Sequence, residues 1–85
     1  MSISAIEARA AKVWFDEEHL WVLLQDGRRI ATPLSYFPRL LKASPEARAS
    51  VELSGGGIGL HWGKLDEDIS VPGLLSGGAD ATRRH

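Results

Sequence analysis

The chain has 85 residues, of which 44% are hydrophobic and 25% charged, and its formal net charge is −1. These values predict one globular domain with a small core, and the balanced charge gives no general attraction to nucleic acid. The absence of cysteine excludes a disulfide framework, a thiolate metal site and a cysteine nucleophile, and it favours a cytoplasmic location.

Three strands are predicted in the first part of the chain. Apolar and polar side chains alternate over residues 11–16, which is typical of a half-buried strand, and a polar hairpin loop follows. Residues 20–24 are apolar on both faces, which predicts a central strand. Asp26 and Gly27 are typical of a tight hairpin turn with positive φ at both central positions, after which residues 28–32 return as the third strand. The result is an antiparallel meander.

Two short helices are predicted next. Ser35 is a candidate cap for a helix over residues 36–43, and Ser44 is a candidate cap for a second helix over residues 45–50. The predicted buried stripe of the first helix consists of Phe37, Leu40 and Leu41.

A second β-hairpin is predicted from residues 51–54 and 58–62, with three glycines as its turn. Ser70 is a candidate cap for a short C-terminal helical turn that carries Val71, Leu74 and Leu75. The predicted fold class is therefore α+β: an antiparallel meander of three strands, two short central helices, a second β-hairpin and a short C-terminal helical turn.

The predicted domain organisation is a single α+β domain over residues 9–76. Residues 1–8 are expected to form an N-terminal extension, and residues 77–85 a flexible C-terminal tail. No apolar run reaches the ~20 residues of a membrane span, and the first residues lack the features of a signal peptide.

The stretches DGR, PLSYFPRLLKASPEAR and IGLHWGKLDEDISVPGLL together resemble the bacterial family called domain of unknown function 2442. The likeness covers about residues 9–76. It implies a small α+β domain with an antiparallel sheet and brings no established activity. Relatives usually have proline at the position of Gly63 and often an Asn-Trp pair at Ala49 and Ser50, so the packing after the second helix is expected to differ here.

The resemblance also implies a kind of partner. Some relatives carry a helix-turn-helix domain after this module, and others are encoded beside a small partner in an arrangement that looks like a toxin–antitoxin pair. This chain stops near the end of the module. The resemblance therefore implies that this chain has an antitoxin-like role and that its partner is a small toxin-like protein. It also implies that this chain does not bind nucleic acid directly.

A candidate polar cluster, His61 with Asp66, Glu67 and Asp68, lies after the second hairpin. Histidine and carboxylate side chains are ligands of divalent cations and partners in acid–base catalysis. Adjacent acids in a turn point in different directions, however, and no second histidine lies nearby. We therefore predict no catalytic residue, metal site or cofactor, and a solvated turn. The alternative is a small metal-binding protein or hydrolytic enzyme that uses His61 with Asp66 or Asp68.

Three tryptophans are many for so short a chain. If the helices cover one face of the sheet, Trp14 and Trp21 lie on the other, and an exposed apolar patch with Trp and Arg is typical of an interaction surface. The alternative is that the terminal segment with Leu74 and Leu75 folds over the indoles as core. The candidate interaction surface consists of Trp14, Trp21, Arg28, Arg29 and Trp62.

The sequence thus predicts a small non-enzymatic cytoplasmic binding module, with no membrane association. It is expected to act as an antitoxin-like or regulatory subunit, through contacts with a protein partner or through self-association as a homodimer.

Overall fold

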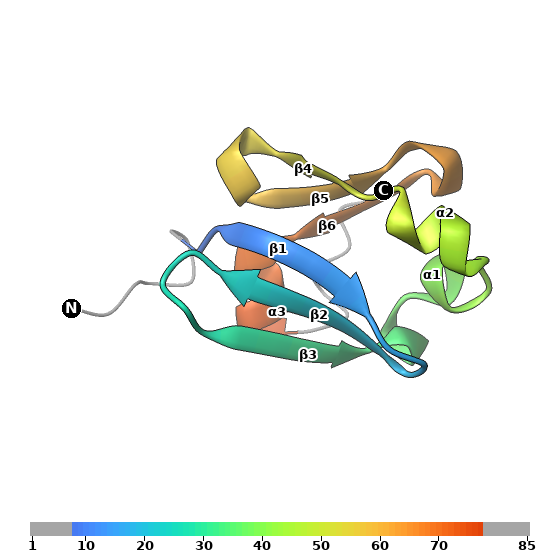
Figure 1. Cartoon of the computed structure of the whole chain (residues 1–85), viewed down its shortest axis with the longest axis horizontal. Helices are drawn as coiled ribbons and strands as arrows, with labels where there is room; N and C mark the ends of the chain where they lie inside the picture. The colour runs from blue at the N-terminus through green and yellow to red at the C-terminus, as the bar shows by residue number, and fades with distance from the viewer. Residues whose placement is uncertain (1–7, 78–85) are drawn as a thin grey trace.

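The computed structural model describes residues 8–77 and contains two three-stranded antiparallel sheets (Figure 1). The first sheet consists of β1 (Ala10–Phe15), β2 (His19–Leu24) and β3 (Arg29–Pro33), in that spatial order. It is the predicted meander, with β2 at its centre. The pairing of β1 with β2 is interrupted by a bulge between Ala10 and Lys12.

The loop between β2 and β3 is a hairpin of a different type from the one predicted. The Gly27 N–H donates to the Leu24 carbonyl at 2.9 Å, and the Leu24 N–H donates to the Arg28 carbonyl at 2.7 Å. The connection therefore has three residues, with Gly27 (φ 96°) as its left-handed member. The prediction of positive φ at Asp26 was wrong because Gly27 supplies the left-handed step alone, while the Asp26 carboxylate accepts hydrogen bonds from Arg28.

The first predicted helix is divided in two by Phe37. Residues Leu34–Tyr36 form a 3₁₀ turn, η2, and α1 spans only Pro38–Leu41. A residue before proline disfavours helical torsion angles, and Phe37 is correspondingly extended, with φ −130° and ψ 86°. Ser35 therefore does not cap a helix, and Leu41, which was predicted to be buried, is 46% exposed.

The second helix, α2 (Pro45–Ala49), begins as predicted, because the Ser44 hydroxyl accepts a hydrogen bond from the Ala47 N–H at 3.1 Å. The chain then forms the predicted hairpin from β4 (Glu52–Ser54) and β5 (Gly59–Trp62), joined by the 3₁₀ turn η3 (Gly55–Gly57).

A sixth strand, β6 (Glu67–Ser70), follows the turn η4 (Gly63–Leu65) and pairs with β5. A charged turn was predicted for these residues. The turn ends at Asp66, whose φ of 52° reverses the chain, and the next two acids already belong to the strand. Glu67 and Ile69 then face the core. The alternation of buried and exposed residues in β6 could not be recognised in the sequence, because the charged residue Glu67 occupies a core-facing position.

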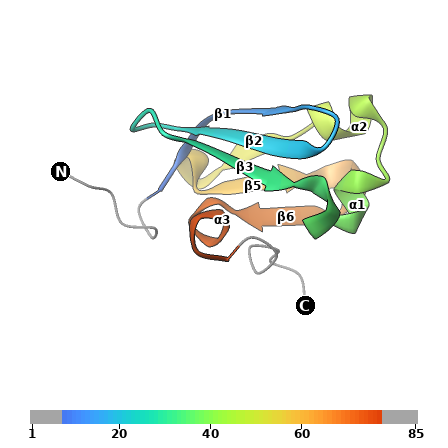
Figure 2. The same ribbon diagram turned by 90° about the horizontal axis from the view of Figure 1, so that it is seen from below.

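The C-terminal helix α3 (Val71–Gly77) is capped as predicted, since the Ser70 hydroxyl accepts a hydrogen bond from the Gly73 N–H at 3.2 Å. It contacts β3 and β6. Figure 2 shows the layers formed by the two sheets, with α3 beside β6 and with α1 and α2 at one end. No helix within residues 8–77 is long and apolar enough to cross a membrane.

One hydrophobic core joins the two sheets and the helices. It contains Ala8, Ala10, Leu20, Val22, Leu24, Leu34, Phe37, Leu40, Leu60, Trp62, Ile69, Val71 and Leu74. Ala8, which the sequence analysis placed in the extension, is a core residue. The predicted tail falls outside the described residues apart from Gly77, the last residue of α3.

Candidate interaction surface

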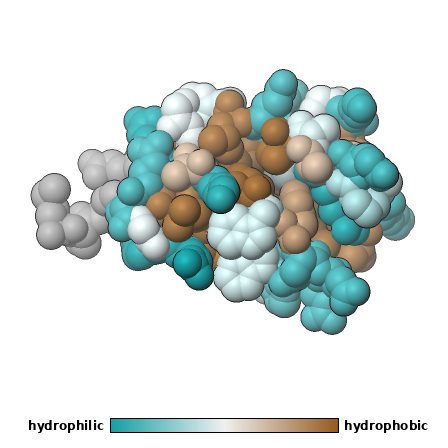
Figure 3. Space-filling view, in the orientation of Figure 1, coloured by the Kyte–Doolittle hydropathy of each residue, from teal (hydrophilic) through white to brown (hydrophobic). Residues whose placement is uncertain are grey.

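Two stacked indole rings lie on the outer face of the first sheet. Trp14 in β1 and Trp21 in β2 are cross-strand partners, with ring centroids 5.8 Å apart and ring planes within 6° of each other. Strand alternation places them opposite the buried Leu20 and Val22. Figure 3 shows neutral and apolar side chains gathered on this side of the molecule, with hydrophilic ones around them. Leu74 joins the core and does not cover the indoles.

Asp16 fixes one end of this indole pair. Its carboxylate accepts hydrogen bonds from the backbone N–H groups of Glu18 at 2.8 Å and His19 at 2.7 Å, and from Nε1 of Trp21 at 2.8 Å. These donors stabilise the charged carboxylate, the Trp21 indole most of all, and they lower the pKa of Asp16 to about 2. The orientation of the Trp21 ring is therefore set by the turn after β1.

The other end of the pair is basic. Lys12, Leu23 and Arg29 lie side by side across the three strands, and with Trp14 they line a hollow of about 430 Å³. Arg28 lies in the hairpin loop, where its Nε donates to the Asp26 carboxylate at 2.7 Å. Of the two predicted arginines, Arg29 thus lies beside the indoles and Arg28 is engaged by the loop. We use the term outer face for Lys12, Trp14, His19, Trp21, Leu23 and Arg29.

Trp62 is not part of this surface. It is fully buried, its Nε1 donates to the Arg48 carbonyl at 2.8 Å, and its ring contacts that of Phe15 edge to face. The prediction that Trp62 contributes to an exposed patch was wrong, because β5 turns Leu60 and Trp62 together toward the core.

The structure brings together two members of the candidate polar cluster. His61 and Asp68 are cross-strand partners in β5 and β6, and Nδ1 of His61 lies 2.6 Å from the Asp68 carboxylate. Both side chains are about half exposed. Asp68 thus lies in β6 and holds the histidine of β5, whereas a solvated turn was predicted for the acids.

The other two members point elsewhere. The side chain of Asp66 is almost fully exposed, and the Asp66 carbonyl accepts a hydrogen bond from Arg39 at 2.6 Å. Glu67, which was expected to be solvated, is buried at the position opposite Trp62. Within residues 8–77, no three His, Cys, Asp or Glu side chains lie where they could hold one metal ion.

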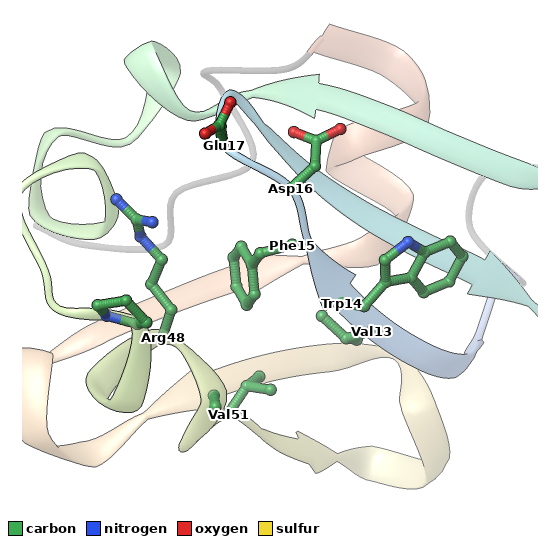
Figure 4. Close-up of a pocket in the computed structure, with 9 residues that line it drawn as sticks. Val13, Trp14, Phe15, Asp16, Glu17, Arg48 and Val51 are labelled. Carbon is green, nitrogen blue, oxygen red and sulfur yellow. The ribbon is translucent and has the colours of Figure 1, made fainter.

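A groove that the sequence analysis missed runs along the free edge of β1, and we call it the edge groove (Figure 4). It has a volume of about 560 Å³ and lies between β1 and α2. Val13, Phe15 and Val51 line its apolar part, and Glu17 and Arg48 line its polar part. The predicted meander places Val13 and Phe15 in an edge strand, but it does not tell that α2 comes near this edge and closes the groove.

Comparison with known proteins finds one protein family and two similar solved structures, all of unknown function. The family model described as "Protein of unknown function (DUF2442)" matches residues 10–80. A crystal structure of a protein of unknown function from Rhodospirillum rubrum is similar, with a TM-score of 0.73 and 41% sequence identity, over 84% of this chain and 88% of that one. A solution NMR structure of an uncharacterised protein from Chromobacterium violaceum has a TM-score of 0.70 and 26% identity, over 84% of this chain and 67% of that one. No curated protein matches significantly. The chain therefore belongs to the DUF2442 family, as its sequence predicted.

Proposed function

We propose that the chain is a non-enzymatic binding module that recognises a protein partner through the outer face of the β1–β2–β3 sheet. The observation that carries this proposal is the stacked indole pair on that face, where Trp14 remains 36% exposed. Tryptophan and arginine are the side chains that contribute most at the centre of protein interfaces. Trp14 and Arg29 line the same hollow and supply both.

The geometry of the face supports binding without large rearrangement. The two rings are fixed against each other, and the Asp16 carboxylate holds the Trp21 ring by its Nε1. A side chain that is already ordered loses little conformational entropy when a partner covers it. Lys12 lines the same hollow as Trp14 and Arg29 and supplies a polar group at its rim, as is usual around an apolar interface centre.

The family resemblance supports a specific form of this proposal, in which the chain is an antitoxin-like or regulatory subunit and the partner is a small protein. Self-association as a homodimer through the same face is the other form. The absence of cysteine is consistent with a cytoplasmic location for either form. His61 and Asp68 form a two-residue pair without a converging third ligand among the described residues, so we propose no metal-dependent or hydrolytic role for them.

The proposal is tested by affinity capture with the tagged chain, followed by mass spectrometry. We expect Trp14→Ala and Arg29→Glu to lower recovery of a reproducible partner by about tenfold or more, as expected for residues at the centre of an interface. His61→Ala is the matched control, because its half-exposed side chain lies on the second sheet, and it should leave recovery unchanged. Light scattering on the same variants tests the homodimer. Equal recovery from all variants, or a monomer that captures nothing, would contradict the proposal.

A further inference from the structure

We infer that the free edge of β1 receives an extended segment of the protein partner as an added β-strand. In this complex, an apolar side chain of the segment enters the edge groove, and a basic residue lies beside the turn Asp16–Glu18. The inference rests on the proposed function, because it names the kind of segment that the partner contributes. Three features support it: the backbone of β1, the lining of the edge groove and the charge at the end of the groove.

The backbone of β1 offers hydrogen-bonding groups on its free side. Within the described residues, β1 pairs with β2 and lies at the end of its sheet. The Asp16 N–H donates to the His19 carbonyl, so alternation along the antiparallel ladder turns the N–H and C=O groups of Val13 and Phe15 away from β2. These groups face the side on which the edge groove lies, and an added strand would pair with them.

Only the first half of β1 is protected against such pairing. A bulge interrupts the strand between Ala10 and Lys12, and Gly57 of η3 approaches the Ala10 backbone closely. Bulges and covering segments are common means by which proteins block the edges of their sheets. From Val13 to Phe15 the strand is regular, without proline, charge or a further bulge, so this half is suited to accept a partner strand.

The edge groove supplies a place for an apolar side chain. Val13 and Phe15 belong to the inner face of the sheet but are only partly buried, and Val51 faces them across the groove (Figure 4). A volume of about 560 Å³ is in the usual range for a binding cleft. Alternate side chains of an added strand would point into this groove, and the others would point toward Trp14, which lines the groove and also belongs to the outer face.

Charge selects a basic residue at the end of the added strand. Three consecutive acids, Asp16 to Glu18, form the exposed turn after Phe15, and Glu17 lines the end of the groove. Arg48, the cation of the groove, is engaged elsewhere: its Nε donates to the Leu40 carbonyl at 2.7 Å and its Nη2 to the Leu41 carbonyl at 2.9 Å. These bonds to neutral carbonyls leave the charge of Arg48 in place, but three acids outnumber this one cation. The end of the groove therefore has a net negative charge that a lysine or arginine of the partner would complement.

The test uses blocked peptides that alternate valine and threonine and carry arginine at either end, with matched peptides that carry glutamate instead. Binding to the full chain is followed by amide NMR spectra. We expect the amide signals of Val13 and Phe15 to shift, the arginine peptide to bind about threefold to fivefold more tightly than the glutamate peptide, and backbone N-methylation of the peptide to weaken binding by tenfold or more. Glu17→Lys should reverse the charge preference, whereas Glu52→Lys, which changes the net charge equally outside the groove, should not.

Three results of the NMR experiment would overturn the inference. The first is no shift at about 1 mM peptide, a concentration that half-occupies a site with a Kd of that size. The second is equal binding of the N-methylated peptide. The third is a shift of the Val13 and Phe15 signals with the concentration of the chain alone, which would assign the edge to a second copy. If Glu17→Lys leaves partner capture unchanged while Trp14→Ala and Arg29→Glu abolish it, the proposed function stands and strand addition is wrong. If no variant affects capture, the proposed function itself fails.

Discussion

Asp16 connects the turn after β1 to the indole pair on the outer face. One carboxylate accepts hydrogen bonds from two backbone N–H groups and from the ring of Trp21. Because all these donors favour the charged form, the pKa of Asp16 falls to about 2 from an ordinary value of 3.8. At the scale of single residues, the order of the outer face thus depends on an ionised carboxylate.

A dependence on pH follows from this lowered pKa. The stabilisation by Asp16 is fully present above its unfolded pKa of 3.8, and it is lost as the pH falls toward the folded value of about 2. We expect the free energy of unfolding to decrease across this interval, and Asp16→Asn to remove part of the decrease. Urea unfolding at several pH values measures it, and the NMR signal of the Trp21 indole N–H should move in the same interval. The Arg28 N–H also lowers the pKa of Asp26, but the Asp26 carboxylate is bonded to Arg28 and not to Trp21, so Asp26→Asn is the control for the indole signal. An unchanged pH profile in Asp16→Asn would contradict the prediction.

The sequence predicted which residues share a strand face better than it predicted which face meets solvent. Trp14 and Trp21 lie opposite Val22 because alternation in a strand is a local property. Trp62 follows the same alternation, but the face it occupies is covered in the tertiary fold, which local patterning does not reveal. The edge groove was missed for a related reason, since it exists only where α2 comes near β1.

At the scale of elements, η3 and β1 meet where two backbones approach closely. A Cβ atom on Gly57 would lie 2.4 Å from the Ala10 carbonyl oxygen, and Gly57 has φ of 102°. Arg9 adds a hydrogen bond from its guanidinium to the Gly55 carbonyl at 2.8 Å. This contact holds the second hairpin against the first sheet at the bulged end of β1.

Two glycine substitutions distinguish the destabilisation caused by the close backbone contact from that caused by the positive φ. Gly57→Ala should lower the free energy of unfolding by about 3 kcal/mol or more, because the methyl group meets backbone that cannot move aside easily. Gly27→Ala is the matched control: its φ of 96° is similarly unfavourable for alanine, but a Cβ there meets nothing within 4 Å, so a cost of about 1–2 kcal/mol is expected. Chemical denaturation measures both. Equal losses would show that torsional strain alone accounts for the effect.

Elements with local signals could be predicted, and those that depend on tertiary contacts could not. The caps Ser44 and Ser70 and the triple-glycine turn act within a few residues, and the elements around them were found. The strand β6 was missed because Glu67 interrupts its apolar pattern at a position that the folded chain buries. The division of the first helix at Phe37 could have been read from Pro38, since proline restricts the residue before it.

At the scale of the whole molecule, the two sheets depend on each other for burial. Leu20 and Val22 of the first sheet belong to the same core cluster as Leu60 and Ile69 of the second, and α3 contacts a strand of each. A three-stranded sheet with one exposed face needs a covering layer to be stable. The sequence predicted two β-segments but did not show that each serves as the cover of the other.

Shared burial predicts unfolding in one step. Leu60→Ala in β5 should lower the free energy of unfolding by about 2–5 kcal/mol. It should reduce the hydrogen-exchange protection of the β2 amides as much as that of the β5 amides, since both sheets open together. Exchange measured by NMR provides the test, with Leu53→Ala in β4 as the control because its side chain is 45% exposed. Unchanged protection in β2 would show that the sheets unfold separately.

The distribution of the three indoles gives the protein separate optical reporters. Two parallel rings 5.8 Å apart couple their electronic transitions, which produces a far-ultraviolet circular dichroism signal that depends on the pair remaining stacked. The third ring, that of Trp62, is fully buried, so we expect it to emit at shorter wavelength than a solvated indole. Occupation of the outer face would thus alter the dichroism couplet while the blue-shifted emission of Trp62 persists, whereas loss of the fold would abolish both.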